Sequence, residues 1–440
     1  MADLSGWGRY PRVEGRLLRP RGAAEVRAAL AEGPVIARGN GRSYGDSAAQ
    51  PAGTLDMRGM AHMLDFDGRT GVLTAEAGVM LEDVIATFLP RGWFPAVTPG
   101  TKLVTLGGMI AADVHGKNHR RDGSFGRHVD WVEVLGPDGV VRRASCSENS
   151  ELFGRTLGGM GLTGVILRCA IRLMRVESGW IRQDMRVAPD LDAAMEIFET
   201  AESRYAVAWF DCLGQGADLG RSLVMLGDHA DVADLPAARR AAPFVTPRRR
   251  RKRVPVDAPA IALNRHTLRA FNSLYFRVNA RKAGPSLVDW DSYFYPLDAI
   301  LDWNRIYGRR GFAQYQVVLP LEASRGGLAA LLRTIATSGR GSFLAVLKRL
   351  GPQESAFSFP MEGYTLALDF PVDPAVLSLL DRLDDITLAH GGRHYLAKDS
   401  RLSREALRKA DPRAAAFAAH RREAGLAGRF ASAQSERLGL

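Results

Sequence analysis

The feature that most constrains this chain is a Gly-rich stretch at residues 98–125, TPGTKLVTLGGMIAADVHGKNHRRDGSF. It combines a Gly107-Gly108 pair and small side chains with the run HGKNH at residues 115–119, which crowds donors and cations into five positions. Glycine lets a backbone approach a ligand closely, and free N–H groups beside a Lys bind anions. The stretch therefore predicts a loop that lies on an anionic ligand. The alternative is a surface loop with incidental charges.

A Gly-rich loop earlier in the chain, called the first Gly-rich loop below, strengthens this interpretation, and the stretch at residues 98–125 is then the second. The predicted short strand 34–37 leads into residues 38–46, RGNGRSYGD, which offer backbone donors, hydroxyls and Arg side chains within one turn. This composition is typical of phosphate binding. A GxGxxG match at residues 159–164 carries less weight, because the fingerprint requires a following helix and residues 165–171 alternate like a strand. A nicotinamide-type site is therefore not expected there.

Length and charge limit the partners. A chain of 440 residues predicts two domains. Its 59 basic and 48 acidic residues leave a net charge of +11, which favours phosphates, a membrane surface or nucleic acid as partners, or else indicates a basic protein with none of them.

Three cysteines without CxxC spacing argue against a disulfide framework or a metal site and fit a reducing compartment. The start lacks the apolar region of a secretory signal, and no apolar run is long enough to span a bilayer, so any membrane contact is expected to be peripheral.

The composition changes near Ser178, where glycine thins out and aromatic residues cluster, which predicts a second domain of mixed α/β type. Within it, the block RRRRKR at residues 248–253 is expected to be a mobile, solvated loop. Residues 293–296, YFYP, and the alternating segment 314–318, QYQVV, suggest strands that line a polar and aromatic pocket. The motif GGRHYLAKDSR at residues 391–401 precedes a helical tail.

Two Gly-rich loops about 60 residues apart, the second followed by a GxxGxTG strand, resemble the flavin domain of the vanillyl-alcohol oxidase/para-cresol methylhydroxylase (PCMH) superfamily. The segments ARGNGRSYGDSA, HGKNH, GGMGLTGVI, FLAVLKRLGP and GGRHYLAKDSR are, in this order, similar to the decaprenylphosphoryl-β-D-ribose 2-oxidase family within that superfamily. The HGKNH and AKDSR motifs are the specific ones.

The resemblance implies an α+β fold with two domains. A PCMH-type FAD-binding domain would span residues 1–177, a separate α/β substrate domain built on an antiparallel sheet would span 178–392, and the C-terminal segment 393–440 would rejoin the FAD domain. It also implies FAD-dependent oxidation of the C2 hydroxyl of a polyprenyl-phosphoryl-β-D-ribose to the 2-keto sugar, the first half of an epimerisation to the arabinose form. A separate NAD(P)H-dependent reductase subunit would complete the reaction.

Other readings stay open. The chain could oxidise another sugar or an aldonolactone, or it could be a flavin-binding partner subunit without turnover. The expected location is the cytoplasm, with a peripheral position on the inner membrane face and an anionic membrane surface as a partner. No nucleic acid partner is expected.

The resemblance also implies roles for individual residues. The cofactor-binding residues would be Arg38, Gly39, Asn40, Gly41, Arg42, Ser43, Tyr44, Gly100, Thr101, Thr105, Gly107, Gly108, Ala111, His115, Gly116, Asn118, Gly161, Gly164, Val165 and Tyr395. The substrate-binding residues would be Lys117, Tyr295, Gln314, Gln316, Lys348 and Lys398. The catalytic residues would be Lys398, His115 and Lys117.

The expected chemistry agrees with these roles. Hydride transfer to flavin N5 leaves negative charge near N1 and C2=O, where a fixed cation stabilises it. Lys398 is the candidate for that cation, and the alternative is a surface lysine paired with Asp399. The hydroxyl proton needs an acceptor, which His115 or Lys117 could organise.

Alternatives remain for other positions too. His115 could be a purely structural histidine, and Gln314 and Gln316 could be ordinary exposed strand residues.

Two departures from the family pattern matter. Superfamily members that attach FAD covalently do so through a His in the first Gly-rich loop, and this loop has none, so non-covalent FAD is expected. Family members carry a Cys where this chain has Ala367.

Overall fold

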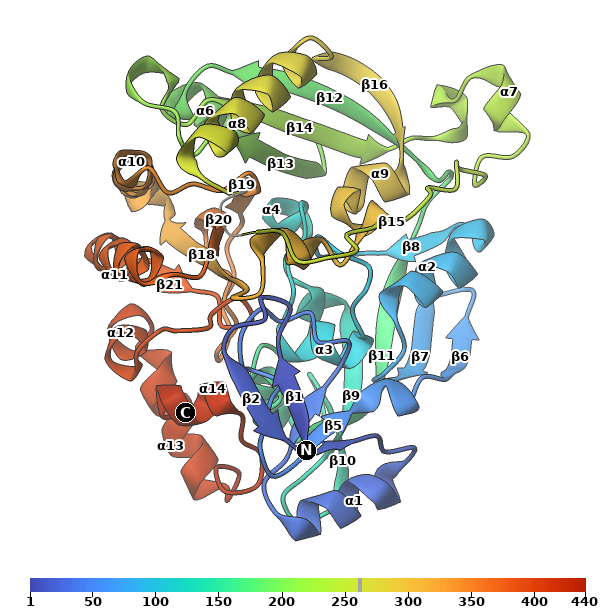
Figure 1. Cartoon of the computed structure of the whole chain (residues 1–440). Helices are drawn as coiled ribbons and strands as arrows, with labels where there is room; N and C mark the ends of the chain where they lie inside the picture. The colour runs from blue at the N-terminus through green and yellow to red at the C-terminus, as the bar shows by residue number, and fades with distance from the viewer. Residues whose placement is uncertain (260–262) are drawn as a thin grey trace.

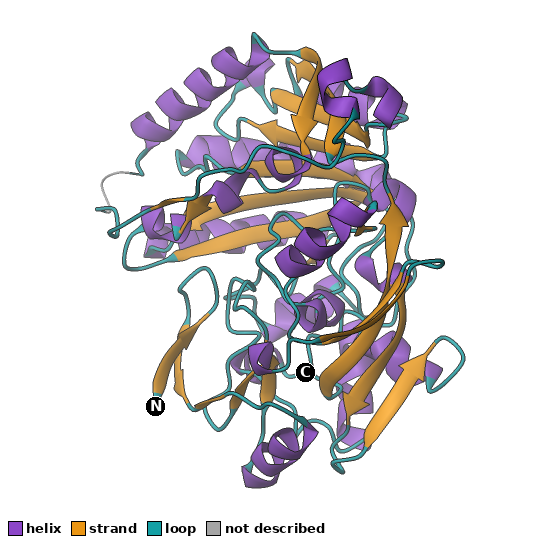
Figure 2. Ribbon diagram, turned by 90° about the vertical axis from the view of Figure 1, so that its right-hand side faces the viewer, coloured by secondary structure: helices purple, strands orange, loops and turns teal. Residues whose placement is uncertain are grey.

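The computed structural model describes residues 1–259 and 263–440, which form two layered halves, each built on an antiparallel sheet (Figures 1 and 2). The first sheet has the order β10-β9-β11-β7-β6, and β8 also pairs with β11. Its strands are β6 (Met63–Asp67), β7 (Val72–Glu76), β8 (Trp93–Pro95), β9 (Val129–Leu135), β10 (Val141–Ser145) and β11 (Val165–Arg175). The strand predicted after the GxGxxG match is confirmed as β11.

Smaller elements extend this half. A hairpin of β1 (Ala2–Ser5) and β2 (Arg12–Gly15) is followed by a parallel sheet in the order β3 (Leu17–Leu18), β5 (Thr54–Asp56), β4 (Ile36–Arg38). The helices of this half are α1 (Ala23–Glu32), α2 (Leu81–Phe88), α3 (Leu106–Ala111), α4 (His119–Asp122) and α5 (Ser150–Thr156). In α2 the buried residues are Leu81, Val84, Ile85 and Phe88, the spacing of one apolar helical face.

The second sheet has the order β16-β12-β14-β13-β19-β20-β18-β21. Its strands are β12 (Trp180–Ala188), β13 (Tyr205–Phe210), β14 (Ser222–His229), β16 (Gly284–Asp289), β18 (Phe312–Pro320), β19 (Ala345–Leu350), β20 (Gly363–Pro371) and β21 (Arg393–His394). The helices of this half are α6 (Leu191–Thr200), α7 (Ala237–Arg240), α8 (Arg265–Ala280), α9 (Trp290–Phe294), α10 (Leu321–Ser338) and α11 (Pro374–Ala389). Apolar faces of α6, α10 and α11 share one buried core with β13, β18, β19 and β20.

The C-terminal segment returns to the first half (Figure 1). After β21, which pairs with β18, the chain forms α12 (Arg404–Ala410), α13 (Arg413–Glu423) and α14 (Ala433–Leu438). Arg437 forms ion pairs with Asp46 of the first Gly-rich loop and with Asp399, at 2.8 and 2.9 Å. The α+β class with antiparallel sheets is as predicted, whereas the exact divisions at 177/178 and 392/393 stay predictions.

The basic block is largely exposed, as its sequence predicts, but other segments hold parts of it in place. Arg249 donates hydrogen bonds to the carbonyls of Asp291, Tyr295 and Pro296, and Arg251 pairs with Glu82 at 2.6 Å. Residues Lys252–Arg253 form β15, which pairs with β17 (Ile300–Leu301). The block docks because neighbouring carbonyls and a carboxylate give its cations partners, which a one-dimensional charge pattern does not reveal.

Candidate functional site

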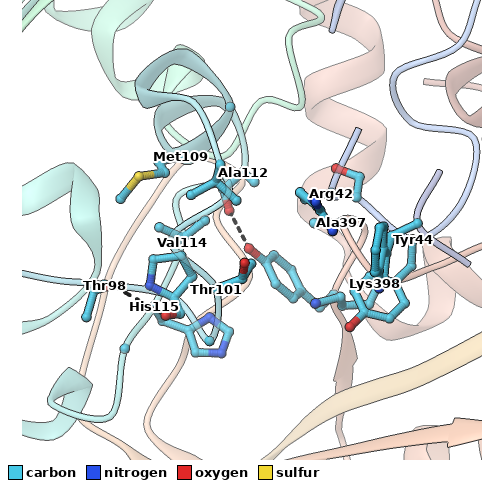
Figure 3. Close-up of a pocket in the computed structure, with 18 of the residues that line it drawn as sticks. Arg42, Tyr44, Thr98, Thr101, Met109, Ala112, Val114, His115, Ala397 and Lys398 are labelled. Carbon is cyan, nitrogen blue, oxygen red and sulfur yellow. Dashed lines mark hydrogen bonds between the residues drawn. The ribbon is translucent and has the colours of Figure 1, made fainter. Parts of the chain in front are cut away.

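Side chains from both halves line a cavity of about 510 Å³. Both Gly-rich loops, the HGKNH segment, strands β13, β18 and β19 and the AKDSR motif contribute to its wall. Figure 3 shows Arg42, Tyr44 and Lys398 on one side of this cavity, and Met109, Val114 and His115 on the other. Segments more than 350 positions apart in the sequence therefore meet around one space.

The two Gly-rich loops hold each other in place. The Asn40 amide donates to the carbonyl of Leu103 at 2.9 Å. A Cβ at Gly39 would lie 2.2 Å from the Thr105 hydroxyl oxygen, so only glycine fits this position without a shift. Thr105 in turn caps α3 by accepting a hydrogen bond from the backbone of Gly108. Together the loops form a tight cradle of backbone groups.

The second Gly-rich loop is also joined to the other half of the molecule. The carboxylate of Asp298, which lines the cavity, accepts hydrogen bonds from the Thr101 hydroxyl at 2.7 Å and from the backbone N–H of Lys102 at 2.8 Å. Asp298 also lies near enough to Arg42 to interact with it electrostatically. These contacts bring both Gly-rich loops to the same end of the cavity.

The AKDSR motif brings Lys398 into the cavity wall. The backbone N–H of Tyr44 donates to the carbonyl of Ala397 at 2.9 Å, and the Lys398 ammonium lies 3.7 Å from the centroid of the Tyr44 ring, a cation–π geometry. Asp399 does not pair with this lysine, because its carboxylate binds Arg437. The alternative of a surface Lys398–Asp399 pair is therefore wrong.

His115 is oriented by a strand of the second sheet. The side-chain amide of Gln316 donates to His115 Nε2 at 3.1 Å, and the ring packs against Tyr395 and Phe359. Burial, followed by the nearby Lys348, holds the His115 pKa well below its usual value. The ring is thus neutral, and because Nε2 accepts, Nδ1 carries the proton. Among the described residues Nδ1 has no hydrogen-bond partner.

The same cavity gathers three lysines, Lys117, Lys348 and Lys398. Burial and the charge of Lys348 lower the pKa of Lys117 to about 7, and burial lowers that of Lys348 to about 8. Burial also lowers the pKa of Lys398, while Asp369 opposes this shift. The Asp369 carboxylate accepts a hydrogen bond from Gln314, and burial raises its pKa. Three amines line one cavity and only Lys398 is coupled to the buried Asp369, so the site suits an anionic ligand.

One consequence can be measured on FAD-free protein. Lys348 has no hydrogen-bond partner or ion pair among the described residues, and its pKa falls from 10.5 in the unfolded chain to about 8 in the fold. Between these two values the unfolded chain binds a proton that the folded chain has lost, so this lysine makes stability rise with pH. We expect Lys348→Met to raise the free energy of unfolding by about 1–2 kcal/mol at pH 7, discounted because Lys348 faces the open cavity.

Urea unfolding of wild type and Lys348→Met at pH 7 and about 9.5 measures this effect. The advantage of the variant should shrink at the higher pH, where folded Lys348 is already neutral. An advantage of equal size at both values would mean that the effect comes from packing rather than from charge.

The structure brings most of the predicted residues to the cavity wall, but not four of them. Arg38 donates behind the first loop to the carbonyls of Ser5 and Ala48. Asn118 is buried against the carbonyl of Ala96 and Asp122. Val165 packs into a separate core, and Tyr295 is fully buried, with its hydroxyl bonded to Thr98. The predicted residues that line the cavity are Gly39, Asn40, Gly41, Arg42, Ser43, Tyr44, Gly100, Thr101, Thr105, Gly107, Gly108, Ala111, His115, Gly116, Lys117, Gly161, Gly164, Gln314, Gln316, Lys348, Tyr395 and Lys398.

Sequence reasoning missed part of the wall. Asp298 gives no pattern signal, and the YFYP motif does not reveal that Tyr293 and Phe294 line the cavity while Tyr295 does not. The wall also includes Ala367, which stands opposite Gln316 and Val346 in the sheet register. Other lining residues outside the prediction are Trp7, Ser47, Met57, Met109, Val114, Met160, Ile166, Trp209 and Tyr275.

Comparisons with known proteins agree with this geometry. Residues 16–145 match the family described as FAD binding domain. The chain is 36% identical to the decaprenylphosphoryl-beta-D-ribose oxidase of Mycolicibacterium smegmatis over 99% of its own length and 97% of that protein. It is 34% identical to an uncharacterized protein in the mprA 5′ region of Streptomyces coelicolor, over 82% of this chain and 100% of that one.

Among solved structures, the fold is similar to that of BBE-like 1 of Physcomitrella patens. The TM-score is 0.63 at 14% identity, and the match covers 92% of this chain and 88% of the other. At this identity the similarity concerns the fold alone.

The residues present fit FAD. The cradle around Gly39 and Gly107 excludes even a Cβ, since one at Gly107 would lie 2.8 Å from Ala77. Such loops place backbone N–H groups against phosphates. The three lysines line the same cavity as His115 and supply positive charge for a flavin ring and a substrate.

Proposed function

Because this chain belongs to the decaprenylphosphoryl-β-D-ribose oxidase family and is an FAD-dependent oxidoreductase, we propose that it oxidises the C2 hydroxyl of a polyprenyl-phosphoryl-β-D-ribose to the 2-keto sugar. The observation that carries the substrate class is the convergence of Lys117, Lys348 and Lys398 in one cavity with the Gln316–His115 pair. The lysines that are protonated complement the negative charge of a phosphate, and the polar pair fixes a neutral ring beside the sugar.

When bound, FAD supplies the two-electron acceptor for the hydride that leaves C2. The chain's own task is to position the sugar, hold positive charge beside the developing negative charge and remove the hydroxyl proton. Gln316 orients His115 in the wall of the cavity, where the neutral ring positions the sugar. Lys398, held over Tyr44, provides the cation.

The geometry favours one of the two candidate proton acceptors. The neutral His115 already carries its proton on Nδ1 and accepts from Gln316 on Nε2, so it has no free lone pair for the substrate. Lys117, with a pKa of about 7, is partly neutral near neutral pH, and its amine donates to the carbonyl of Tyr293, which leaves a lone pair available. We therefore propose that the Lys117 amine accepts the proton of the C2 hydroxyl.

A substrate panel tests this function. We expect turnover with a short-chain polyprenyl-phosphoryl-β-D-ribose and an artificial electron acceptor, together with accumulation of the 2-keto product until a separate NAD(P)H-dependent reductase is added. Preferential turnover of an aldonolactone or a free pentose would contradict the assignment, and a flavin-loaded protein that turns over none of these compounds would indicate an idle partner subunit.

We also propose that FAD is held without a covalent bond. The loop at residues 38–46, which lies in the cavity wall, contains no histidine. Precipitation of the purified holoenzyme with acid should leave a colourless pellet and a yellow supernatant. Flavin colour that stays with the washed pellet would contradict a non-covalent cofactor.

A further inference from the structure

Helix α8 carries an exposed apolar stripe on the outside of the second half. It lies across the top of the view in Figure 1 and packs against β14. Phe271, Leu274, Tyr275 and Val278 have exposed fractions of 45, 64, 36 and 41%. Their spacing of i, i+3, i+4 and i+7 places them on one side of the helix. Four large apolar side chains in a row on a surface helix indicate a binding surface.

An adjoining side of α8 anchors it to the protein. Leu268 packs into the core of the second sheet, and Asn272, which is fully buried, donates to Asp211 at 2.9 Å. At its start, the Asn264 side chain accepts from the backbone N–H of His266. The helix is therefore fixed in the orientation that turns its stripe outward.

The charges around the stripe are of one sign. The segment between Asp257 and Asp289 contains no Asp or Glu, and it carries five cations, Arg265, Arg269, Arg277, Arg281 and Lys282. None of the five forms an ion pair with a carboxylate in the described part of the chain. Apolar side chains flanked by unpaired cations are typical of helices that lie in the interface of an anionic bilayer.

The stripe continues into the cavity. Tyr275 belongs to both, since it is part of the exposed row and also lines the cavity, and its ring lies 4.7 Å from that of Trp209, a second lining residue. A lipid-linked substrate could therefore keep its chain in a bilayer at α8 while its polar head reaches the cavity along Trp209. No helix among the described residues is long and apolar enough to cross a bilayer, so contact through α8 would be interfacial.

We propose that α8 is a docking surface for an anionic lipid bilayer, with Phe271, Leu274 and Val278 entering the interface and the arginines contacting lipid phosphates. This inference rests on the proposed function for the identity of the lipid-linked substrate, but not for the binding itself. It places the main membrane contact on α8 rather than on the basic block 248–253, in which Arg249 and Arg251 contact other segments of the protein.

Sedimentation of the holoenzyme with vesicles tests the proposal. Wild type should bind mixed phosphatidylglycerol/phosphatidylcholine vesicles, bind phosphatidylcholine vesicles more weakly and lose affinity as salt is added. Leu274→Gln/Val278→Gln, neither of which lines the cavity, should lower the partition coefficient about tenfold. Arg277→Gln/Arg281→Gln should weaken binding mainly at low salt.

Leu64→Gln/Val140→Gln is the matched control, because both residues are exposed apolar residues of the first half, at 46 and 50%. Equal loss of binding in this control, or wild type that stays in the supernatant with anionic vesicles, would overturn the proposal. Unchanged vesicle binding by the α8 variants would also overturn the proposal, and the stripe would then be better explained as a surface that binds a protein partner.

Turnover of a water-soluble, short-chain phosphoryl ribose separates this inference from the proposed function. Turnover of this compound without vesicle binding would contradict the proposed docking surface and support the proposed function. Vesicle binding without turnover would support the docking surface and contradict the proposed function.

Discussion

Lys398→Met is expected to keep FAD bound and to slow flavin reduction by substrate roughly 10²- to 10³-fold, the usual loss when one preorganised partner of a developing charge is removed. Lys398 lies in the cavity wall over Tyr44 and is coupled electrostatically to Asp369. Methionine keeps the length of the side chain and removes its charge. The cofactor should remain bound because the Gly-rich loops, rather than Lys398, form the cradle.

Rapid-mixing measurement of flavin absorbance without oxygen gives this rate directly. Lys409→Met is the matched control, since Lys409 is an exposed residue of α12 that pairs with Glu405 on the surface, away from the cavity. A Lys398→Met variant that reduces its flavin at nearly the wild-type rate would show that the lysine is structural. Complete loss of FAD from the variant would point to a role in cofactor binding instead.

Gly39→Ala is expected to weaken FAD binding roughly 10- to 100-fold, because overpacking by one methyl typically costs about 1–3 kcal/mol. The new Cβ would lie 2.2 Å from the Thr105 hydroxyl oxygen, so the two Gly-rich loops would have to move apart. Titration of FAD into FAD-free protein measures the dissociation constant. Gly154→Ala, where a Cβ meets nothing within 4 Å, should bind FAD as wild type does.

A double-mutant cycle sharpens this prediction. Thr105→Ala removes the oxygen that the new Cβ would meet and leaves Thr105 Cβ at 3.3 Å from it. Gly39→Ala should therefore cost less FAD affinity in the Thr105→Ala background than in wild type. Equal costs in both backgrounds would show that the contact between the loops does not set the affinity.

The sequence patterns predicted the parts of the site that depend on local chemistry. The Gly-rich loops and the HGKNH and AKDSR motifs are short segments whose composition alone restricts their use, and their residues meet at one cavity. The sequence after the GxGxxG match also predicted a strand instead of the helix that a dinucleotide-binding site requires. That strand is β11, which pairs antiparallel with β7.

What could not be predicted depends on tertiary packing. Adjacent residues of the YFYP motif face different surroundings, so Phe294 lines the cavity whereas Tyr295 bonds to Thr98 behind it. Arg249 and Arg251 find partners on segments far away in the sequence. The stripe on α8 has a helical spacing that is also typical of a buried face, and only the fold shows that it points outward.

The most direct test of the account is the absorbance of the purified holoenzyme, followed without oxygen, as a polyprenyl-phosphoryl-β-D-ribose is added. We predict that the visible absorbance of oxidised flavin bleaches in proportion to the substrate added and that one 2-keto sugar forms per flavin reduced. A flavin that stays oxidised with this compound but bleaches with an aldonolactone would contradict the proposed substrate.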